Sequence, residues 1–461
     1  MSGPSDAAPL SDGVTPVKIE AWAAGGRGLG RVDGRVWMVT GAVPGDRVLA
    51  RVAKDHGRWV EATVAAVETL SPSRREPPCP IQGACGGCPL MLVGEASQRD
   101  AKRRFVLDAL ERIGHLGPGL PVGDVVATPP ALAYRNKIEL TFGRGAGSSR
   151  FLGYHRAGQP TELVDVESCA IAEPQLAPLL AAVRAFFLAG PGSKEPALDG
   201  SQEPLRLVLR SSGGRDERLI AFRGPTGPFP SLNEFARSAC LADSGLVGVV
   251  RLLAVPGRRG GARVETIAGR AWIEDEIHGT SFRVPAATFL QVHPRAADSL
   301  GRHVLEGAGS PRHVLELYGG IGALGLALAR RGARATIVDA DPLAIACGSE
   351  AAQSHGVNRA EFARADVFEF LGQPSDAPAP DLVIADPPRT GLGNGVAQRL
   401  AGLGVPRLAM VSCDPATLAR DLAALVSRGY AVTKVTPFDL FPQTAHVEAV
   451  AWLSRSDGSR R

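Results

Sequence analysis

Cys413 is the residue of this chain whose type and position most clearly suggest chemistry. It lies in the segment Val411-Ser412-Cys413-Asp414-Pro415, at the end of an apolar run and just before a helical pattern. The run predicts a parallel strand, and open α/β sheets bind their ligands at the C-terminal ends of such strands. Because a thiolate is a strong nucleophile, this position predicts a nucleophilic cysteine.

Four other cysteines, Cys79, Cys85, Cys88 and Cys169, are spaced like the ligands of a metal site. Five residues separate the first from the second, two separate the second from the third, and glycines between them let the loop fold tightly. Four thiolates can hold an iron–sulfur cluster or a zinc ion. Zinc sites usually combine two closely spaced Cys pairs, and this chain has one such pair, so the spacing favours iron–sulfur while zinc stays open.

A glycine loop and two acidic residues predict a cofactor site in the second half of the chain. Residues 313–318 form a predicted strand, and Gly319-Gly320-Ile321-Gly322 and a helix follow it, so backbone N–H groups can face a ligand. Asp339 ends the next apolar strand, 17 residues after Gly322, where a carboxylate can accept the ribose hydroxyls of an adenosyl group. Asp386 follows another apolar strand and opens the segment Asp-Pro-Pro-Arg. The chain has no Gly-x4-Gly-Lys loop, which argues against a nucleoside triphosphate.

The composition indicates a globular chain of several domains. At 461 residues, two or three domains are expected, and a hydrophobic fraction of 44% argues against global disorder. Residues 1–13 lack the basic start and apolar run of a signal peptide, and no stretch of about 18 apolar residues could span a membrane. Seven cysteines do not suggest a secreted disulfide scaffold, so we expect a cytoplasmic protein.

Residues 14–69 predict a small β-barrel. The expected strands are Val17–Trp22, Gly30–Val36, Val48–Val52 and Trp59–Val67, with turns at 26–30 and 44–46. Strands this short in so short a segment predict a five-stranded barrel of the oligonucleotide-binding type. Residues 18–60 hold eight Lys/Arg against four Asp/Glu, a surplus equal to the net charge of +4 of the whole chain. This surplus suggests either a phosphate-rich partner or a solvated arginine-rich surface, and three tryptophans (Trp22, Trp37, Trp59) could stack on bases.

The rest of the chain changes character along its length. Residues 70–90 are rich in Pro and Cys and predict irregular structure, residues 95–115 predict a basic helix, and residues 120–285 are dominated by strand patterns. From residue 311 onward, apolar strands alternate with alanine-rich helices, which predicts βαβ units and a parallel sheet.

These motifs together resemble the RNA uracil-5-methyltransferase family, and within it the iron–sulfur branch that acts on 23S rRNA. The resemblance covers most of the chain, and its most specific parts are the segments Ser412–Asp421 and Phe441–Glu448. Phe289–Gln291, Leu317–Gly322 and Asp386–Arg389 also match. The glycine-rich residues 26–30 and 41–48 resemble a TRAM domain, an RNA-binding barrel found on RNA-modifying enzymes.

The resemblance implies a multidomain α/β architecture. It places a TRAM-like RNA-binding β-barrel over residues 9–69 and a central mixed α+β domain, with the iron–sulfur loop and an RNA-binding surface, over residues 70–285. A Rossmann-like methyltransferase domain dependent on S-adenosylmethionine follows over residues 286–461. We therefore expect an RNA (uracil-5-)-methyltransferase that acts on RNA as a monomer, without a membrane or a protein partner.

The resemblance also implies roles for single residues. Cys413 matches the nucleophile that adds to C6 of a uracil, and Glu448 matches the general base that removes the C5 proton. A carboxylate in the otherwise apolar strand around Glu448 also needs a reason of this kind. The positions that contact S-adenosylmethionine are Gln291, Tyr318, Asp339, Asp366 and Asp386, and the ligands of a [4Fe-4S] cluster are Cys79, Cys85, Cys88 and Cys169.

Four positions depart from the family pattern. His293 stands where an asparagine is common, Gly319 replaces a common cysteine, and Ala323 replaces a polar residue that can contact the cofactor. Asp414 replaces the commoner asparagine beside the expected nucleophile. A carboxylate there would raise the pKa of the Cys413 thiol unless it is paired.

Three other functions stay open. A tRNA uracil-54 methyltransferase is the nearest, although that branch usually lacks the four-cysteine pattern and the basic barrel. A radical methylthiotransferase also combines a TRAM domain with a cluster, but it requires a Cys-x3-Cys-x2-Cys triplet that this sequence lacks. A non-catalytic TRAM-type RNA-binding protein would leave Cys413 and Glu448 without a purpose.

Overall fold

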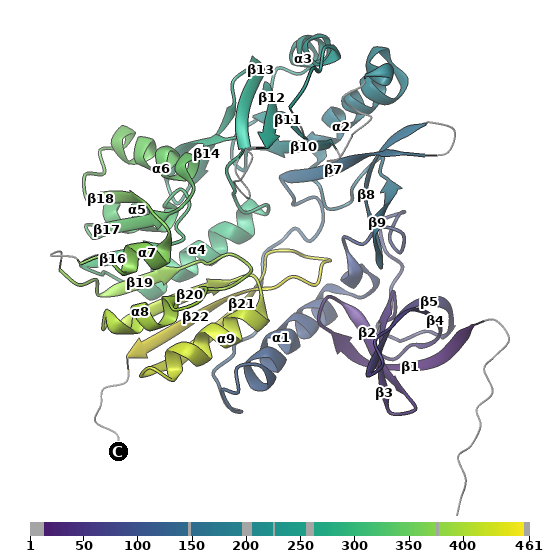
Figure 1. Cartoon of the computed structure of the whole chain (residues 1–461), viewed down its shortest axis with the longest axis horizontal. Helices are drawn as coiled ribbons and strands as arrows, with labels where there is room; N and C mark the ends of the chain where they lie inside the picture. The colour runs from purple at the N-terminus through teal and green to yellow at the C-terminus, as the bar shows by residue number, and fades with distance from the viewer. Residues whose placement is uncertain are drawn as a thin grey trace, which may run out of the picture. The chain divides into compact units, whose positions relative to one another are not determined.

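The computed structural model describes residues 13–145, 149–195, 205–224, 226–254, 262–374 and 378–455 (Figure 1). The chain divides into two compact units. Unit 1 comprises residues 1–105, 154–166 and 441–446, and unit 2 comprises residues 106–153, 167–440 and 447–461. The three domains expected from the sequence do not correspond one to one to these two units, and the three-domain division stays a prediction.

Unit 1 begins with a five-stranded closed barrel, as predicted. Its strands are β1 (Val14–Ala23), β2 (Arg27–Val32), β3 (Arg35–Thr40), β4 (Arg47–Asp55) and β5 (Trp59–Thr69). They close in the order β1-β2-β3-β5-β4, shown in purple in Figure 1. Ile19, Val39 and Val48 have no exposed surface and belong to the cluster that fills the interior. Alternate residues of short strands thus build one small core.

The strand boundaries inside the barrel differ from the prediction at two places. The expected strand Gly30–Val36 is two strands, because Asp33 and Gly34 form a tight turn with φ of 48° and 76°. The expected turn at 26–30 lies mostly in β2. A Cβ on Gly30 would come within 2.3 Å of the Lys18 carbonyl oxygen, so glycine here permits the close approach of β1 rather than a turn.

Asp46 ties the barrel to the segment that leaves it. Its carboxylate accepts N–H bonds from Val43 and Ser71 at 2.8 Å each and pairs with Arg74 Nη2 at 2.6 Å. Burial raises the pKa of Asp46, but these partners outweigh burial and hold the pKa below its ordinary value. One of the four acids of the basic segment therefore has a structural role.

The part of unit 1 that follows the barrel is mostly irregular, as predicted for residues 70–90. A 3-10 helix at Pro89–Leu92 ends the cysteine loop. Helix α1 (Glu95–Arg112) confirms the helix predicted for residues 95–115.

A seven-stranded sheet confirms the strand-rich character predicted for residues 120–285. Its order is β13-β12-β11-β10-β7-β8-β9. The strands are β7 (Lys137–Arg144), β8 (Arg150–Arg156), β9 (Gln159–Asp165), β10 (Arg206–Ser211), β11 (Arg218–Gly224), β12 (Leu246–Ala254) and β13 (Ala262–Gly269). The helical elements of this region are Pro174–Leu176, α2 (Ala177–Arg184), a π-turn at Ala185–Ala189, Pro191–Lys194 and α3 (Ser231–Ala242). A separate hairpin joins β14 (Trp272–Ile277) to β15 (Thr280–Pro285).

An eight-stranded sheet forms the C-terminal α/β domain. Its order is β18-β17-β16-β19-β20-β22-β21-β6. The strands are β6 (Val126–Ala127), β16 (His313–Leu317), β17 (Arg334–Asp339), β18 (Ala360–Arg364), β19 (Leu382–Ala385), β20 (Arg407–Ser412), β21 (Tyr430–Asp439) and β22 (Glu448–Arg455). Strands β16 to β20 pair in parallel, and β22 runs antiparallel to β20 and β21. The predicted parallel α/β sheet is therefore confirmed.

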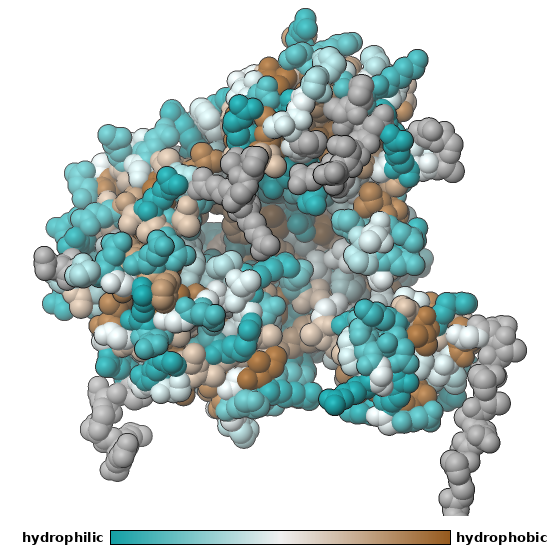
Figure 2. Space-filling view, viewed as in Figure 1, coloured by the Kyte–Doolittle hydropathy of each residue, from teal (hydrophilic) through white to brown (hydrophobic). Residues whose placement is uncertain are grey.

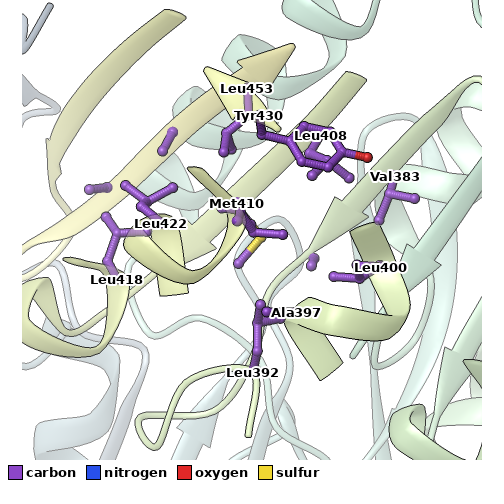
Figure 3. Packing of buried hydrophobic residues seen from close by; sticks show 14 of the residues in the cluster. Val383, Leu392, Ala397, Leu400, Leu408, Met410, Leu418, Leu422, Tyr430 and Leu453 are labelled. Atoms are coloured by element: carbon purple, nitrogen blue, oxygen red, sulfur yellow. The ribbon is translucent and has the colours of Figure 1, made fainter. Parts of the chain in front are cut away.

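The helices of this domain pack around the sheet. They are α4 (Pro294–Ala308), α5 (Ala323–Arg330), α6 (Pro342–Ser354), α7 (Val367–Leu371), α8 (Val396–Gly402) and α9 (Pro415–Val426). Leu400 of α8 and Leu418 and Leu422 of α9 belong to one buried cluster with Leu408 and Met410 of β20 (Figure 3). This core holds the strand that ends just before Cys413. Within the described ranges, no helix is both long and apolar enough to cross a membrane.

Candidate active site

Five of the seven predicted catalytic and cofactor-binding residues lie at one edge of the eight-stranded sheet. Tyr318, Asp386 and Cys413 are the residues that directly follow the parallel strands β16, β19 and β20. Asp339 ends β17 at the same edge. Because the C-terminal ends of parallel strands meet at one edge, the topology gathers residues that are far apart in the sequence.

Glu448 joins this edge because β22 runs antiparallel to β20. The last pair in the register of these strands is Ser412 with Ala449. Cys413 and Glu448 are the next residues beyond that pair, one on each segment, and the charge of Glu448 acts on the Cys413 thiol. The thiol and the carboxyl group predicted as nucleophile and base are therefore cross-strand neighbours.

The Glu448 carboxyl group has an unusual environment. It is 2% exposed, and its Oε2 has no hydrogen-bond partner among the residues that the structure describes. Burial raises the pKa of Glu448 to about 8, with a further upward contribution from Asp386 and an opposing one from Arg389. A carboxyl group that titrates near neutral pH can act as a general base or acid.

The Cys413 thiol is protonated at neutral pH in this environment. Burial raises its pKa to about 11, the charge of Glu448 adds to the increase, and Arg389 opposes it. The thiolate is the reactive form of cysteine, so activation of Cys413 requires either transfer of its proton or additional positive charge nearby.

Asp414, the departure beside this thiol, is paired. Its Oδ1 accepts N–H bonds from Ala416 and Thr417 at 2.9 Å each, which caps the N-terminus of α9. The helix end thus engages the carboxylate, and the charges that act on Cys413 are those of Glu448, Arg389 and Asp386.

A cavity of about 430 Å³ lies beside this edge. Gln291, Tyr318 and Asp386 line it, together with Gly319 and Gly320 of the glycine loop. The cavity gives access to the Asp386 carboxylate, yet the surrounding protein atoms desolvate it, which raises its pKa to about 6. A concave site with few, well-placed polar groups suits a small ligand.

Asp339 and Asp366 do not line this cavity but contact or influence residues that do. Asp339 Oδ2 accepts the Gly320 N–H at 2.8 Å and so fixes the glycine loop. Asp366 caps α7 by accepting the Glu369 N–H at 3.2 Å. Burial and then the charge of Asp366 raise the pKa of Tyr318, which places this carboxylate within electrostatic reach of the cavity.

Glu316 is a cavity residue that the sequence analysis missed. It is 4% exposed, lines the cavity and accepts the Gly325 N–H at 2.8 Å. Burial raises its pKa to about 8, and the charges of Asp386 and Asp339 add to the increase. The sequence did contain a signal for this residue, because Glu316 is an acid inside the otherwise apolar run of β16. The departure at Gly319 leaves room for this side chain, because a Cβ there would lie 3.0 Å from Glu316 Cγ.

His293, another departure, caps helix α4. Its Nδ1 accepts the Ala296 N–H at 3.4 Å, and its Nε2 lies 3.2 Å from the Thr128 carbonyl oxygen. Its ring stacks on Tyr134 at 4.6 Å, and burial lowers its pKa, so the ring is neutral with its proton on Nε2. A cap by an imidazole nitrogen supplies the acceptor that an asparagine side chain would supply. Ala323, the remaining departure, lines the cavity.

Comparison with known proteins gives matches along most of the chain. Residues 14–65 match the TRAM domain, residues 375–456 match the tRNA (uracil-5-)-methyltransferase family, and residues 298–401 match conserved hypothetical protein 95. An uncharacterized RNA methyltransferase of Thermosynechococcus vestitus is 35% identical over 449 residues, which cover 95% of this chain and 98% of that protein. A second, from Gloeobacter violaceus, is 35% identical over 450 residues, 95% of this chain and 96% of that protein.

The chain belongs to the RNA (uracil-5-)-methyltransferase family. This family member shares its fold with a solved structure, the Pyrococcus abyssi tRNA (uracil-54, C5)-methyltransferase in complex with S-adenosyl-L-homocysteine. The TM-score is 0.72 at 23% identity, over 95% of this chain and 100% of that chain. The predicted combination of an N-terminal barrel with a C-terminal methyltransferase domain is therefore confirmed.

The four predicted cluster ligands of this RNA methyltransferase have intermediate exposure. Cys79, Cys85 and Cys88 belong to unit 1, and Cys169 belongs to unit 2. The described residues contain no group of three or more His, Cys, Asp or Glu side chains gathered as a metal site requires. Gly87 N–H lies 3.5 Å from Cys85 Sγ, an orientation that suits a ligated sulfur. The loop thus has an N–H group that could donate to a ligated sulfur, but the described side chains are not brought together as a complete set of metal ligands.

The barrel of this methyltransferase carries positive charge that its own carboxylates do not neutralise. Three of the eight basic residues form ion pairs, which are Arg27–Glu61, Arg35–Asp55 and Arg47–Glu68. The other five have no carboxylate partner in the described part of the chain; they are Lys18, Arg31, Arg51, Lys54 and Arg58. The face of the barrel seen in Figure 2 is mainly hydrophilic.

The barrel tryptophans differ in their availability for stacking. Trp37 is 6% exposed and belongs to the barrel core. Trp22 packs against a second buried cluster. Trp59 stacks on His56 with ring centroids 3.9 Å apart and planes inclined by 7°. Of the three predicted stacking residues, Trp59, of intermediate exposure, is therefore the one that already stacks on another ring.

Proposed function

We propose that this enzyme transfers the methyl group of S-adenosylmethionine to C5 of a uridine in RNA, and that its substrate is 23S rRNA. The opposition of Cys413 and Glu448 at the strand edge supports this reaction most directly. In this proposal Gln291, Tyr318 and Asp386, which line the cavity, hold the cofactor, and Asp339 and Asp366 support the loops around it. S-adenosylmethionine supplies an electrophilic methyl group.

The two opposed side chains account for the steps that the protein performs. C5 of uracil is a weak nucleophile, so the Cys413 thiolate first adds to C6, and the electron pair of the C5–C6 bond moves toward C5 and O4. C5 then forms a bond to the methyl carbon while the bond from that carbon to the sulfonium sulfur breaks; the sulfur keeps the electron pair, and S-adenosylhomocysteine is the leaving group. Glu448 accepts the C5 proton, the C6–S bond breaks with its electron pair returning to Cys413, and the ring double bond re-forms. Correct positioning can supply up to about 7–11 kcal/mol of the barrier.

The basic barrel supports RNA as the substrate. A uracil must leave its stack before Cys413 can reach C6, which costs a few kcal/mol. The five cations without carboxylate partners and the Trp59–His56 stack offer phosphate and base contacts that can offset this cost. We expect the enzyme to act as a monomer, which light scattering of the purified protein tests.

Substitution of the nucleophile tests the proposed reaction. Cys413→Ala is expected to abolish transfer of labelled methyl groups from S-adenosylmethionine to RNA. Cys240→Ala is the matched control, because Cys240 lies on α3 outside the strand edge, and this variant is expected to keep full activity. Retained methyl transfer by Cys413→Ala would overturn the covalent mechanism. Mapping 5-methyluridine in 23S rRNA and tRNA, with and without the protein, identifies the substrate.

Transfer RNA is the second candidate substrate. The fold shared with the Pyrococcus abyssi tRNA (uracil-54, C5)-methyltransferase favours it. That match covers 95% of this chain, so possession of a barrel does not discriminate between the two substrates. A protein-dependent 5-methyluridine found in tRNA and absent from 23S rRNA would select this alternative.

We further propose that Cys79, Cys85, Cys88 and Cys169 bind a [4Fe-4S] cluster. Their spacing and the Gly87 N–H near Cys85 support this assignment. Protein purified without oxygen is expected to contain four iron and four sulfide per chain and to absorb broadly in the visible range. Cys169→Ser should lower the iron content, whereas Cys240→Ser should not. Zinc in an iron-free, colourless protein would contradict the cluster.

A further inference from the structure

The segment 441–446 of unit 1 leads directly to the proposed base. β21 ends at Asp439 and β22 begins at Glu448, so the eight residues 440–447 connect two antiparallel neighbours. Turn geometry alone fixes the register of hairpins with loops of about two to five residues. The pairing of Glu448 with Phe438 sets the register of β22, but a connection of this length needs other contacts to hold the backbone that enters the strand.

Gln443 fixes the backbone in the middle of this segment. It is 1% exposed and has a φ of 71°, a left-handed conformation that a glutamine rarely adopts. Its N–H donates to Gln98 Oε1 at 2.9 Å, and its carbonyl oxygen accepts the Leu90 N–H at 3.0 Å. Such a conformation persists where the surroundings determine it.

Gln98 of α1 makes the contact reciprocal. It has no exposed surface, and its Nε2 donates to Gln443 Oε1 and to the Val93 carbonyl oxygen at 2.9 Å each. Arg75 Nη2 donates a further hydrogen bond to Gln443 Oε1 at 2.9 Å. A buried polar network with satisfied partners specifies one geometry, because any shift leaves a buried group without its partner.

Contacts at both ends hold the rest of the segment. Lys102, which has no exposed surface, donates from Nζ to the Phe441 carbonyl oxygen at 2.9 Å. A Cβ on Gly26 of the barrel would lie 3.2 Å from Ala445 Cβ, so the barrel also packs closely against the segment. These side chains all belong to unit 1, and the segment returns from them to Glu448 through Val447.

We propose that Gln98 and Gln443 are positioning residues that set the place of Glu448. The inference rests on the proposed function, because it assumes that Glu448 removes the C5 proton. The two glutamines act through the backbone from Gln443 to Glu448 and not on the reactants. Loss of their hydrogen bonds leaves Cys413 in place and slows the removal of the C5 proton, so the methylated covalent adduct accumulates.

The variant Gln98→Met tests this proposal, since methionine has nearly the same size but makes none of the three hydrogen bonds. With saturating S-adenosylmethionine and unmodified RNA, kcat should fall by about 10²-fold, the loss expected of a misplacement of about 1 Å. KM for RNA should fall together with kcat, because the slowed step follows methyl transfer, so kcat/KM and the Kd for S-adenosylmethionine should stay within about twofold of wild type. A covalent protein–RNA complex that carries the methyl group should appear on denaturing gels. Gln353→Met, at an exposed glutamine of α6, is the matched control and should behave as wild type.

RNA that contains 5-fluorouridine distinguishes a misplaced Glu448 from other defects of the variant. Fluorine at C5 cannot leave as a cation, so the adduct persists whether or not Glu448 is well placed. Wild type and Gln98→Met should both be captured at the same rate. Three results for Gln98→Met would overturn the positioning role. The first is capture by 5-fluorouridine RNA that is slowed as much as kcat, and the second is a lower kcat without a covalent adduct on unmodified RNA. The third is a kcat equal to that of wild type. Failure of wild type to be captured would instead overturn the proposed function.

A milder variant keeps the test usable if Gln98→Met lowers the yield of folded protein. Arg75→Lys keeps the charge and removes the hydrogen bond to Gln443 Oε1. It should accumulate the same methylated adduct with a smaller loss of kcat, of about tenfold. Absence of the adduct at reduced kcat would count against the proposal.

Discussion

Cys413 and Glu448 each lie one residue beyond Ser412 and Ala449, the last pair in the register of β20 and β22, and the charge of Glu448 acts on the Cys413 thiol. C6 and C5 of a uracil are adjacent atoms, so one side chain of this pair can attack C6 while the other takes the proton from C5. Burial and the neighbouring negative charge raise the pKa of the Cys413 thiol, and burial and the charge of Asp386 raise that of Glu448. The site therefore disfavours a Cys413 thiolate and a Glu448 carboxylate at the same time. Transfer of one proton between the two groups changes which of them is the reactive anion.

Glu448→Gln should stop turnover after the methyl group has been transferred. Glutamine keeps the size of the side chain but cannot accept the C5 proton, and loss of a general base typically costs about 10²–10⁴-fold. The expected result is a covalent RNA complex that contains the labelled methyl group, seen by denaturing electrophoresis. Glu306→Gln, an exposed position on α4, is the charge-matched control and should form no lasting complex. Full turnover by Glu448→Gln would remove Glu448 from the mechanism.

The rate should rise with pH through the titration of Glu448. Its pKa is about 8 in the folded enzyme, so the reactive carboxylate is the minor form at neutral pH and the major form above about 8. The pH dependence of kcat, which reports groups of the enzyme–substrate complex, should show this ascending limb, because Glu448 acts after the methyl transfer. Adduct formation by Glu448→Gln should lack that limb and rise only toward the higher pKa of Cys413. A rate that is flat from pH 6 to 9 would contradict the assignment.

The same titration should lower stability as the pH rises. The pKa of Glu448 is raised on folding, so the folded state binds the proton more tightly than the unfolded state. Its contribution to stability is complete below the ordinary pKa of 4.5 and is lost as the pH rises through about 8. Chemical denaturation of wild type and Glu448→Gln between pH 5 and 9 should therefore show a weaker pH dependence for the variant. Equal slopes would show that other groups carry the effect.

Much of this site could be predicted from the sequence because the end of each strand is visible as the end of an apolar run. The apolar runs before Tyr318, Asp386 and Cys413 locate residues at strand termini, and parallel pairing then brings them to one edge. The opposition of Cys413 and Glu448 could not be predicted in this way. It depends on β22 running antiparallel to β20 in one register, and no local pattern encodes which strands become neighbours.

Other differences have local physical reasons. Glu316 was missed although it is an acid in an apolar strand, the same signal that supported Glu448. The strand predicted from Gly30 to Val36 was wrong because Asp33 and Gly34 can both adopt positive φ, which turns the chain between two strands. The cap formed by His293 depends on contacts with Thr128, a residue distant in sequence.

Asp46→Ala should destabilise the barrel strongly. The substitution leaves Arg74 without its buried partner and two backbone N–H groups without their acceptor, and breaking a buried ion pair costs about 3–5 kcal/mol. Hydrogen exchange of β1–β5 measures the barrel separately from unit 2. Glu20→Ala, an exposed position on β1, is the control and should change stability by less than about 0.5 kcal/mol. Because the pKa of Asp46 is lowered on folding, its stabilisation should be lost as the pH falls below about 4.

Asp414 should act on α9 rather than on the charge of Cys413. Asparagine can accept the same N–H bonds, so Asp414→Asn should keep both the stability and the rate of capture by 5-fluorouridine RNA. Asp414→Ala removes the cap, at a cost of about 1 kcal/mol, and frees the helix start that follows Cys413 directly, so capture should slow several-fold. Thermal unfolding and capture rates from pH 6 to 9 distinguish the two variants. A marked acceleration by Asp414→Asn at neutral pH would mean that the carboxylate does hold the thiol in its protonated form.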